Sequence, residues 1–152
     1  MSNYSSLNRP VDIHVLGTVS IPANSPANSK YVMSFATDPT LPDVSYQYIR
    51  SFASEYILLK RVLVPATANL GGFDGYLTFS VDGIDQQIVL GLMSLTVPTL
   101  YNPVVYKNVL TVDPNQTLSV YFIPTSTQTV VATVSIEFVY ARVPKAFKGK
   151  VS

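Results

Sequence analysis

The last long apolar run of the chain, Gln128 to Val143, limits what it can fold into more than any other feature. Between Val130 and Tyr140 every second residue is apolar, while the intervening positions mix Thr, Ser, Glu and Val. A period of two is typical of a β-strand. β-branched and aromatic residues fill the run without Gly or Pro, so it predicts a long strand with one core-facing side. One strand is not stable alone, so the remaining chain must supply neighbouring strands and a second layer.

Seven further segments have strand character and are separated by turn sequences rich in Pro, Gly and Asn. The strongest local signal is Asp82-Gly83 between two alternating runs, because this dipeptide favours a two-residue type I′ hairpin turn. Residues 38–48 read as a longer irregular connection, and a bend is expected at Gly17. The seven predicted strands are 11–21, 30–37, 54–64, 76–81, 84–90, 104–112 and 117–123.

This pattern predicts an all-β, single-domain protein, since 152 residues suffice for one core. Eight short strands without a convincing helix favour an eight-stranded antiparallel jelly-roll sandwich or barrel. An immunoglobulin-like β-sandwich is the alternative; its Cys and Trp markers are absent, but they are optional outside antibodies. The expected organisation is an extended N-terminal arm at 1–10, the β domain at 11–143 and a basic C-terminal tail at 144–152.

Charge is sparse, because only 12% of the residues are Asp, Glu, Lys or Arg, against about 25% in an average soluble domain. Ten tyrosines dominate the aromatic residues. Low surface charge favours association, and tyrosine is enriched at interfaces, so we expect other subunits to cover much of the surface. In the alternative reading, Ser, Thr, Asn and Gln replace charge on a solvated surface. The chain has no cysteine, and the start lacks a secretory pattern, so we expect assembly in a cytoplasm.

The sequence holds no catalytic or metal-binding motif. His14 is the single histidine, and although Asp12 lies two residues away on the same strand face, nothing marks a nucleophile for a triad. Asp74, Asp82 and Asp85 lie near glycine turns, but their spacing matches no established calcium loop, which favours a role in solvated turns. We therefore expect no enzymatic activity, no metal and no cofactor.

Two sets of residues are candidates for contact with a partner. Four basic residues near the C-terminus could contact lipid headgroups or nucleic acid, or could belong to a solvated terminus. Three tyrosines on predicted loops could lie at an interface or stack on a ligand. The basic residues are Arg142, Lys145, Lys148 and Lys150, and the tyrosines are Tyr46, Tyr48 and Tyr101.

The segment from Thr111 to Ile123, followed by the Val130 to Val143 strand with its aromatic end, resembles viral single jelly-roll capsid proteins. The hairpin sequence Y-L-T-F-S-V-D-G at 76–83 is similar in style to virion proteins of phages. Within this class the chain looks most like the small major capsid protein of tailless, membrane-containing bacteriophages.

This resemblance implies a structural virion subunit, assembled in the host cytoplasm into an icosahedral shell. It further implies self-association into a dimer or larger oligomer, contact with a second capsid protein, barrels standing on an internal lipid membrane, and no specific nucleic acid. The alternative function is a ligand- or receptor-binding β-sandwich, such as a carbohydrate-binding module or a spike head, with the loop tyrosines as stacking platforms.

Overall fold

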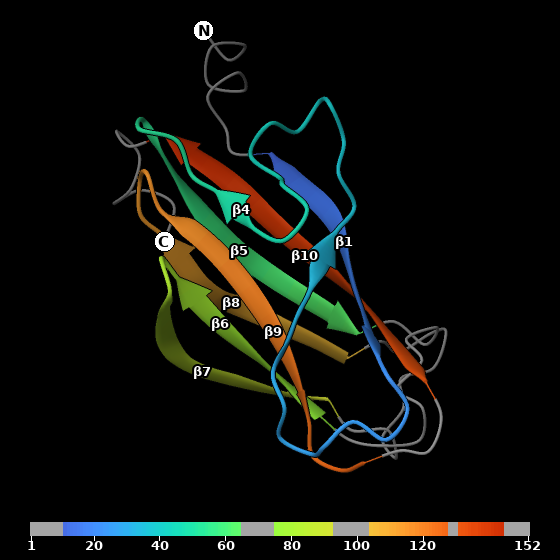
Figure 1. Cartoon of the computed structure of the whole chain (residues 1–152). Helices are drawn as coiled ribbons and strands as arrows, with labels where there is room; N and C mark the ends of the chain where they lie inside the picture. Colours follow the sequence, from blue (N-terminus) through green and yellow to red (C-terminus); the bar gives the residue numbers. More distant parts are fainter. Residues whose placement is uncertain (1–10, 65–74, 93–103, 128–130, 145–152) are drawn as a thin grey trace, which may run out of the picture.

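The computed structural model describes residues 11–64, 75–92, 104–127 and 131–144, which form an all-β sandwich (Figure 1). Two antiparallel sheets pack face to face, so the predicted all-β sandwich class is confirmed. The strands are β1 (Asp12–Ile21), β2 (Tyr31–Val32), β3 (Ser34–Phe35), β4 (Ile49–Arg50), β5 (Glu55–Val64), β6 (Gly75–Val81), β7 (Ile84–Leu92), β8 (Val104–Val112), β9 (Thr117–Pro124) and β10 (Ala132–Pro144).

The pairing of the strands is nested along the chain. Sheet A has the order β3-β1-β10-β5-β8, and sheet B has the order β2-β9-β6-β7, with β4 also pairing with β9. The hairpin β6–β7 lies innermost in the sequence; β5 then pairs with β8, β2 with β9, and β1 with β10. The chain thus runs as a two-stranded ribbon, folded back at the β6–β7 turn and wound into two layers.

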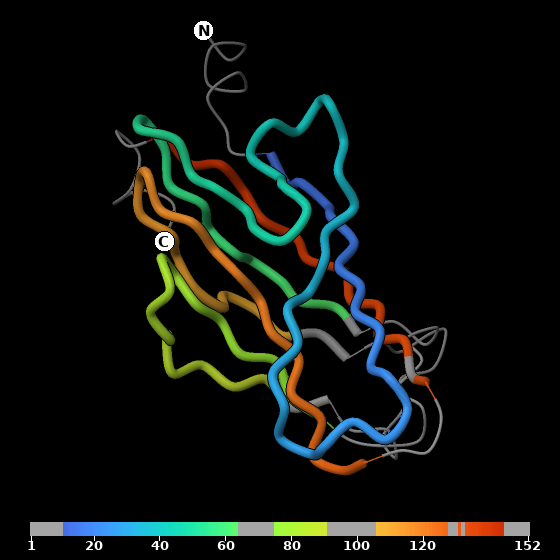
Figure 2. The backbone as a smooth tube through the Cα atoms, viewed as in Figure 1, coloured from blue at the N-terminus to red at the C-terminus, as the bar shows by residue number. Residues whose placement is uncertain are grey.

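The predicted count of eight strands is wrong, because the structure has ten within its described residues. The predicted strand at 30–37 is divided, since this extended segment pairs with β9 through Tyr31 and Val32 and then crosses to β1 through Ser34 and Phe35. At the crossing, the Met33 N–H still donates to the Val120 carbonyl of sheet B, at 2.8 Å. We call residues 30–36 the crossing segment; it closes one side of the sandwich (Figure 2). The second difference is β4, which follows the predicted connection at 38–48.

The central strand of sheet A is β10, which pairs with β1 from Ala132 to Ala141 and with β5 from Glu137 to Pro144. Its predicted core face is confirmed from Val134 onward, because Val134, Ile136, Phe138 and Tyr140 are fully buried. Val130, where the predicted face begins, lies outside the described residues. Phe138 meets Phe35 of the crossing segment edge to face, with ring centroids 5.6 Å apart. Toward the C-terminal end of β10 the opposite face is also covered, where Ala141 and Val143 pack with Tyr56. Side chains on both faces of this strand are therefore buried there.

The expectation of a bend at Gly17 is wrong, because β1 pairs with β10 without interruption across this residue. A Cβ atom there would lie 2.6 Å from Cε2 of Phe138, so glycine is required for the close approach of the Phe138 ring. The predicted hairpin turn is confirmed: Asp82 and Gly83 have φ values of 51° and 81°, as a type I′ turn demands.

Candidate functional site

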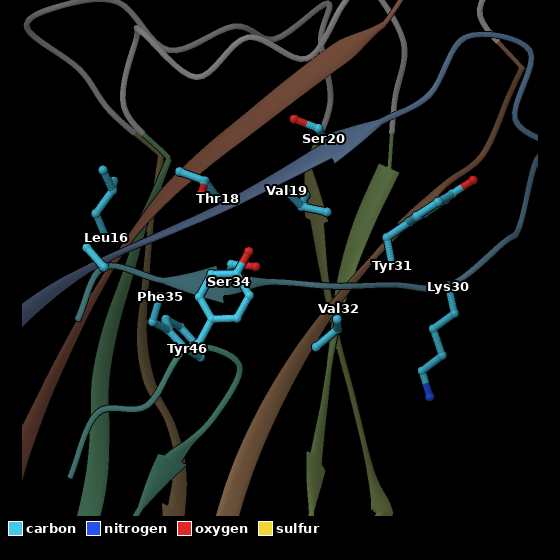
Figure 3. Close-up of a pocket in the computed structure, with 11 residues that line it drawn as sticks. Leu16, Thr18, Val19, Ser20, Lys30, Tyr31, Val32, Ser34, Phe35 and Tyr46 are labelled. Carbon is cyan, nitrogen blue, oxygen red and sulfur yellow. The ribbon is translucent and has the colours of Figure 1, made fainter. Parts of the chain in front are cut away.

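An open groove of about 670 Å³ lies on the side of the sandwich that the crossing segment closes. One wall is β1 and the other is the crossing segment, and Tyr46 from the loop between β3 and β4 lies beside Ser34 at one end (Figure 3). Hydroxyl groups and aromatic rings dominate the lining. They come from Thr18, Ser20, Ser34, Tyr31 and Tyr46.

The groove exists because the crossing segment diverges from β1. The register Thr18↔Ser34 would next place Ser20 opposite Val32, but Val32 pairs instead with Tyr121 of β9. The Ala36 N–H donates to the Leu16 carbonyl at 2.9 Å, and strand residues alternate the direction of their backbone groups. The N–H and C=O of Ser20 therefore point into the groove, and they add a donor and an acceptor to its wall.

Lys30 is the single charged residue of the lining, and its ammonium lies over the Tyr121 ring at 4.2 Å from the ring centroid. This contact holds the charge on the outer side of sheet B. The remaining lining is uncharged and combines a large exposed ring, Tyr46 at 65% exposure, with hydroxyl and amide groups. Such a surface fits a neutral ligand that offers hydroxyl groups and a flat apolar side.

The loop that carries Tyr46 and Tyr48 is held by a buried carboxylate. The Tyr140 hydroxyl of β10 donates to Asp43 Oδ2 at 2.6 Å, and Nε of Arg142 lies 3.6 Å from the same oxygen. Asp43 is fully buried, and its Oδ1 accepts no hydrogen bond within the described part of the chain. Burial, followed by the hydrogen bond to the neighbouring Asp43, raises the pKa of Tyr140 far above its ordinary value. This contact anchors the loop to the central strand.

The Asp43 anchor was not predicted from the sequence. Asp43 and Tyr140 are 97 residues apart, and the acid lies in a segment that reads as an irregular connection. The only local signal is an acid flanked by Pro42 and Val44, which does not identify a partner.

The predicted tyrosines lie in different surroundings. The groove is lined by Tyr46 and not by Tyr48, although Tyr48 is exposed on the same loop. The structure therefore does not bring these two rings into one platform around the groove. Tyr101 lies outside the described residues.

The predicted basic set is divided in a similar way. Arg142 belongs to β10, which extends to Pro144, and its guanidinium lies beside the buried Asp43. Its charge is therefore paired with that of Asp43, inside the sandwich. Lys145, Lys148 and Lys150 lie outside the described residues, so their contact with lipid or nucleic acid stays a prediction.

The outer face of sheet A, the side turned away from the core, carries a network of charged pairs. Asp12 accepts hydrogen bonds from Lys60 Nζ at 2.7 Å and from Arg61 Nη2 at 3.1 Å. A register shift in the β5–β10 pairing leaves Lys60 without a directly opposite residue, between Leu59 and Arg61. The hydrogen bond from Lys60 is the main cause that lowers the pKa of Asp12.

The structure gives His14 a different neighbour from the one considered for a triad. Its Nδ1 lies 2.5 Å from Glu137 Oε1 on β10, and Asp12 is occupied by the two cations of β5. Asp82 and Asp85 act in turns: Oδ1 of Asp82 accepts from the Thr117 N–H and Oδ1 of Asp85 from the Gln87 N–H. Asp74 is outside the described residues. The described residues bring together no group of three His, Cys, Asp or Glu that could hold a metal.

A scan against models of protein families found no match for this chain, and a search of curated proteins found none either. None of the described residues forms a helix of the length and hydrophobicity that a bilayer crossing requires. A proposal for the function therefore depends on the fold and on the surfaces described above.

Proposed function

We propose that this chain is a structural virion protein with a jelly-roll fold that self-associates and packs with other capsid subunits into an icosahedral shell. The nested strand pairing carries the proposal: a two-stranded ribbon wound into two antiparallel layers is the arrangement of a jelly roll, a fold common among viral capsid domains. An immunoglobulin-like sandwich fits less well, because here the first strand pairs with the last in the middle of a sheet. The role is structural and involves no catalysis.

The surface supports self-association. Several large apolar side chains are exposed, and two of them, Ile84 at 68% and Val89 at 61%, lie on the same edge strand, β7. An isolated soluble domain with so few charges would be prone to association, whereas a capsid subunit buries such residues against its neighbours. The exposed apolar residues are Val11, Leu16, Tyr46, Tyr48, Ile84, Val89 and Val131.

The proposal includes contact of the basic C-terminal tail with an internal lipid membrane and contact with a second capsid protein. Three lysines, at 145, 148 and 150, follow β10 without an intervening acid. Each lysine near an anionic membrane surface contributes about 1 kcal/mol of attraction. Arg142 is not part of this contact, because it faces Asp43.

The test mixes the purified chain with vesicles of phosphatidylcholine and phosphatidylglycerol and examines them by flotation and electron microscopy. We expect the chain to float with the vesicles and to form regular arrays on them. A variant with Lys145, Lys148 and Lys150 changed to Gln should float less and still self-associate. A chain that neither binds vesicles nor assembles at any accessible concentration would contradict the proposal.

A second candidate function is carbohydrate binding in the groove, as a receptor-binding module would require. The observation that favours it is the combination of the exposed Tyr46 ring with the hydroxyls of Thr18, Ser20 and Ser34. A glycan array distinguishes the two functions. Binding that is lost in Tyr46→Ala and retained in Tyr48→Ala would favour the carbohydrate site, and silence of the folded wild-type chain would exclude it for the glycans tested.

A further inference from the structure

The edges of the two sheets are protected to different degrees. One edge of sheet A ends in the two-residue strand β3, and the corresponding edge of sheet B ends in the two-residue strands β2 and β4. The other edge of sheet A is β8, which has an irregular register, a positive φ of 52° at Asn108 and the exposed Lys107. Short strands, bulges and lysines are devices that prevent pairing with another chain. The remaining edge, β7 of sheet B, has fewer of them.

The part of β7 beyond its hairpin end is a regular, uncharged edge. A bulge near the turn places Gln87 at a φ of 58°, and its N–H is used by Asp85 Oδ1. From Val89 to Leu92 the strand pairs with β6 residue by residue. Asp85 is the single charged residue of β7, and the Val89 side chain is 61% exposed. A neutral edge with an exposed β-branched residue is suited to pair with another strand.

The direction of the backbone groups can be derived from the hairpin. Val81 and Ile84 flank the two-residue turn and are therefore a hydrogen-bonded pair. The backbone N–H and C=O groups of successive residues in β6 point alternately toward β7 and toward β9. Leu77 therefore also forms hydrogen bonds with β7, and Thr78 forms them with β9. The Asp82 N–H, which donates to Thr117 of β9 at 2.9 Å, agrees with this alternation.

The partner of Thr78 in the register is Val89, so the N–H and C=O of Val89 point away from β6, toward the free edge. Within the residues that the structure describes, no strand pairs with this side of β7. The edge thus offers a backbone donor and a backbone acceptor next to an exposed apolar side chain.

We propose that β7 pairs antiparallel with β7 of a second copy of this chain, about a two-fold axis at Val89. The strand is complementary to itself in this register: Val89 lies opposite Val89, and Ile88 lies opposite Leu90. The two Asp85 carboxylates lie on opposite sides of the axis, so no like charges face each other. Pairing of β8 with β8 about an axis near its centre would instead bring the exposed Lys107 side chains of both copies close to each other.

This contact is isologous, so it closes at a dimer and removes the exposed edge of sheet B. The inference rests on the proposed function, since it names the surface through which a self-associating subunit first pairs. It adds the residues, the strand direction and the symmetry of that contact.

The test is sedimentation velocity of the full chain across concentration, with variants at Val89. Val89→Pro removes an N–H that points away from β6, so the hairpin keeps its own hydrogen bonds while both central bonds of the dimer are lost. We expect dimerisation about tenfold weaker or more. Val89→Lys should have the same effect, because it adds a charge to the edge. Thr133→Lys, at an exposed β-branched residue of the central strand β10 and not of a sheet edge, is the control and should dimerise like wild type.

Circular dichroism establishes that each variant is folded. Should the Val89 variants unfold, amide hydrogen exchange of the wild type replaces them: the Val89 amide should become protected as the concentration rises, and the Ile84 to Gln87 amides should change less. A folded Val89→Pro that dimerises like wild type, or a Val89 amide whose exchange is independent of concentration, would overturn the inference. Because the chain would still associate, the proposed function would survive that result, whereas a monomeric wild type would overturn both.

Discussion

The outer faces of the two sheets differ in how they treat charge. On sheet A the charged side chains near the centre of the outer face meet each other, as Asp12 does with Lys60 and Arg61, whereas Lys107 is exposed on the edge strand β8. On the described part of sheet B the centre of the outer face is uncharged, and its charges lie at the margins, in Lys30, Arg50 and Asp85. The central residues of that face are Val32, Tyr76, Thr78, Ser80, Val89, Ser119, Tyr121 and Ile123.

The difference shows that this chain, which has few charges, places pairs of them on one sheet and leaves the centre of the other sheet's outer face uncharged. A face with paired charges keeps its hydration and satisfies its own ions, so it needs no partner. A face of tyrosines, hydroxyls and aliphatic side chains resembles the centre of a protein interface, where charge is depleted and Tyr is enriched. We therefore assign contact with other subunits first to sheet B and its β7 edge.

The largest expected effect is a loss of stability when alanine replaces a glycine on the core-facing side of each sheet. A Cβ at Gly75 of sheet B would lie 2.2 Å from Cζ of Phe122, whereas a Cβ at Gly17 of sheet A would lie 2.6 Å from Cε2 of Phe138. Both Gly→Ala variants should lower the free energy of unfolding by about 1 to 3 kcal/mol, Gly75→Ala more than Gly17→Ala. Urea unfolding measures this difference. Gly83→Asn, at a turn with open space, is the control, and a Gly75→Ala variant as stable as that control would contradict the packing described.

The next effect concerns the anchor between β10 and the tyrosine loop. Tyr140→Phe removes the hydroxyl that donates to Asp43 and leaves a buried carboxylate without that bond, so the free energy of unfolding should fall by about 1 to 3 kcal/mol at pH 7. Tyr48→Phe, at an exposed ring of the same loop, should change it little.

The raised pKa of Tyr140 should also make the folded state less stable at alkaline pH. The pKa of Tyr140 is higher in the folded state than in the unfolded chain, so the folded state holds its proton more tightly. Its stabilisation is complete below the unfolded value of about 10 and decreases as the pH rises above it. Denaturant unfolding between pH 8 and pH 11 should show this decrease in wild type and in Tyr48→Phe, and a weaker one in Tyr140→Phe. Equal slopes for all three proteins would refute the assignment.

The smallest effect tests the charged face of sheet A. Asp12→Asn should lower the free energy of unfolding by about 0.2 to 1 kcal/mol, because the three side chains are roughly a third exposed and the pair is screened. The pKa of Asp12 is lowered in the fold, so its stabilisation is present above about pH 4 and is lost as the pH falls below that value. Unfolding at pH 7 and pH 3, in low and high salt, measures both. A penalty that is independent of salt would show that Asp12 acts through packing instead.

Local features of the sequence predicted most of the strands. The alternation in β10 and the Asp82-Gly83 turn depend on neighbouring residues, and the structure places both as predicted. The division of residues 30–37 could not be predicted, because it depends on which sheet each half of the segment meets.

The groove and the Asp43 anchor could be predicted from the sequence only in small part. Tyr46 was identified as an exposed loop tyrosine, but the groove beside it arises from the divergence of β1 and the crossing segment. Arg142 reads as part of a basic tail in the sequence, yet the strand continues through it and turns its guanidinium toward a carboxylate 99 positions earlier in the chain, at Asp43. Such pairings depend on tertiary structure and leave no periodic signal.

The most direct test of the central claim, that this chain is a self-associating structural subunit, is the mass of the purified protein in solution by light scattering across concentration. We predict a mass that rises from that of the 16.6 kDa monomer to a dimer and then to larger assemblies. High salt should not reverse this rise, because the proposed contact surface is uncharged. A mass that stays at the monomer value up to the highest accessible concentration, in low and in high salt, would contradict the account.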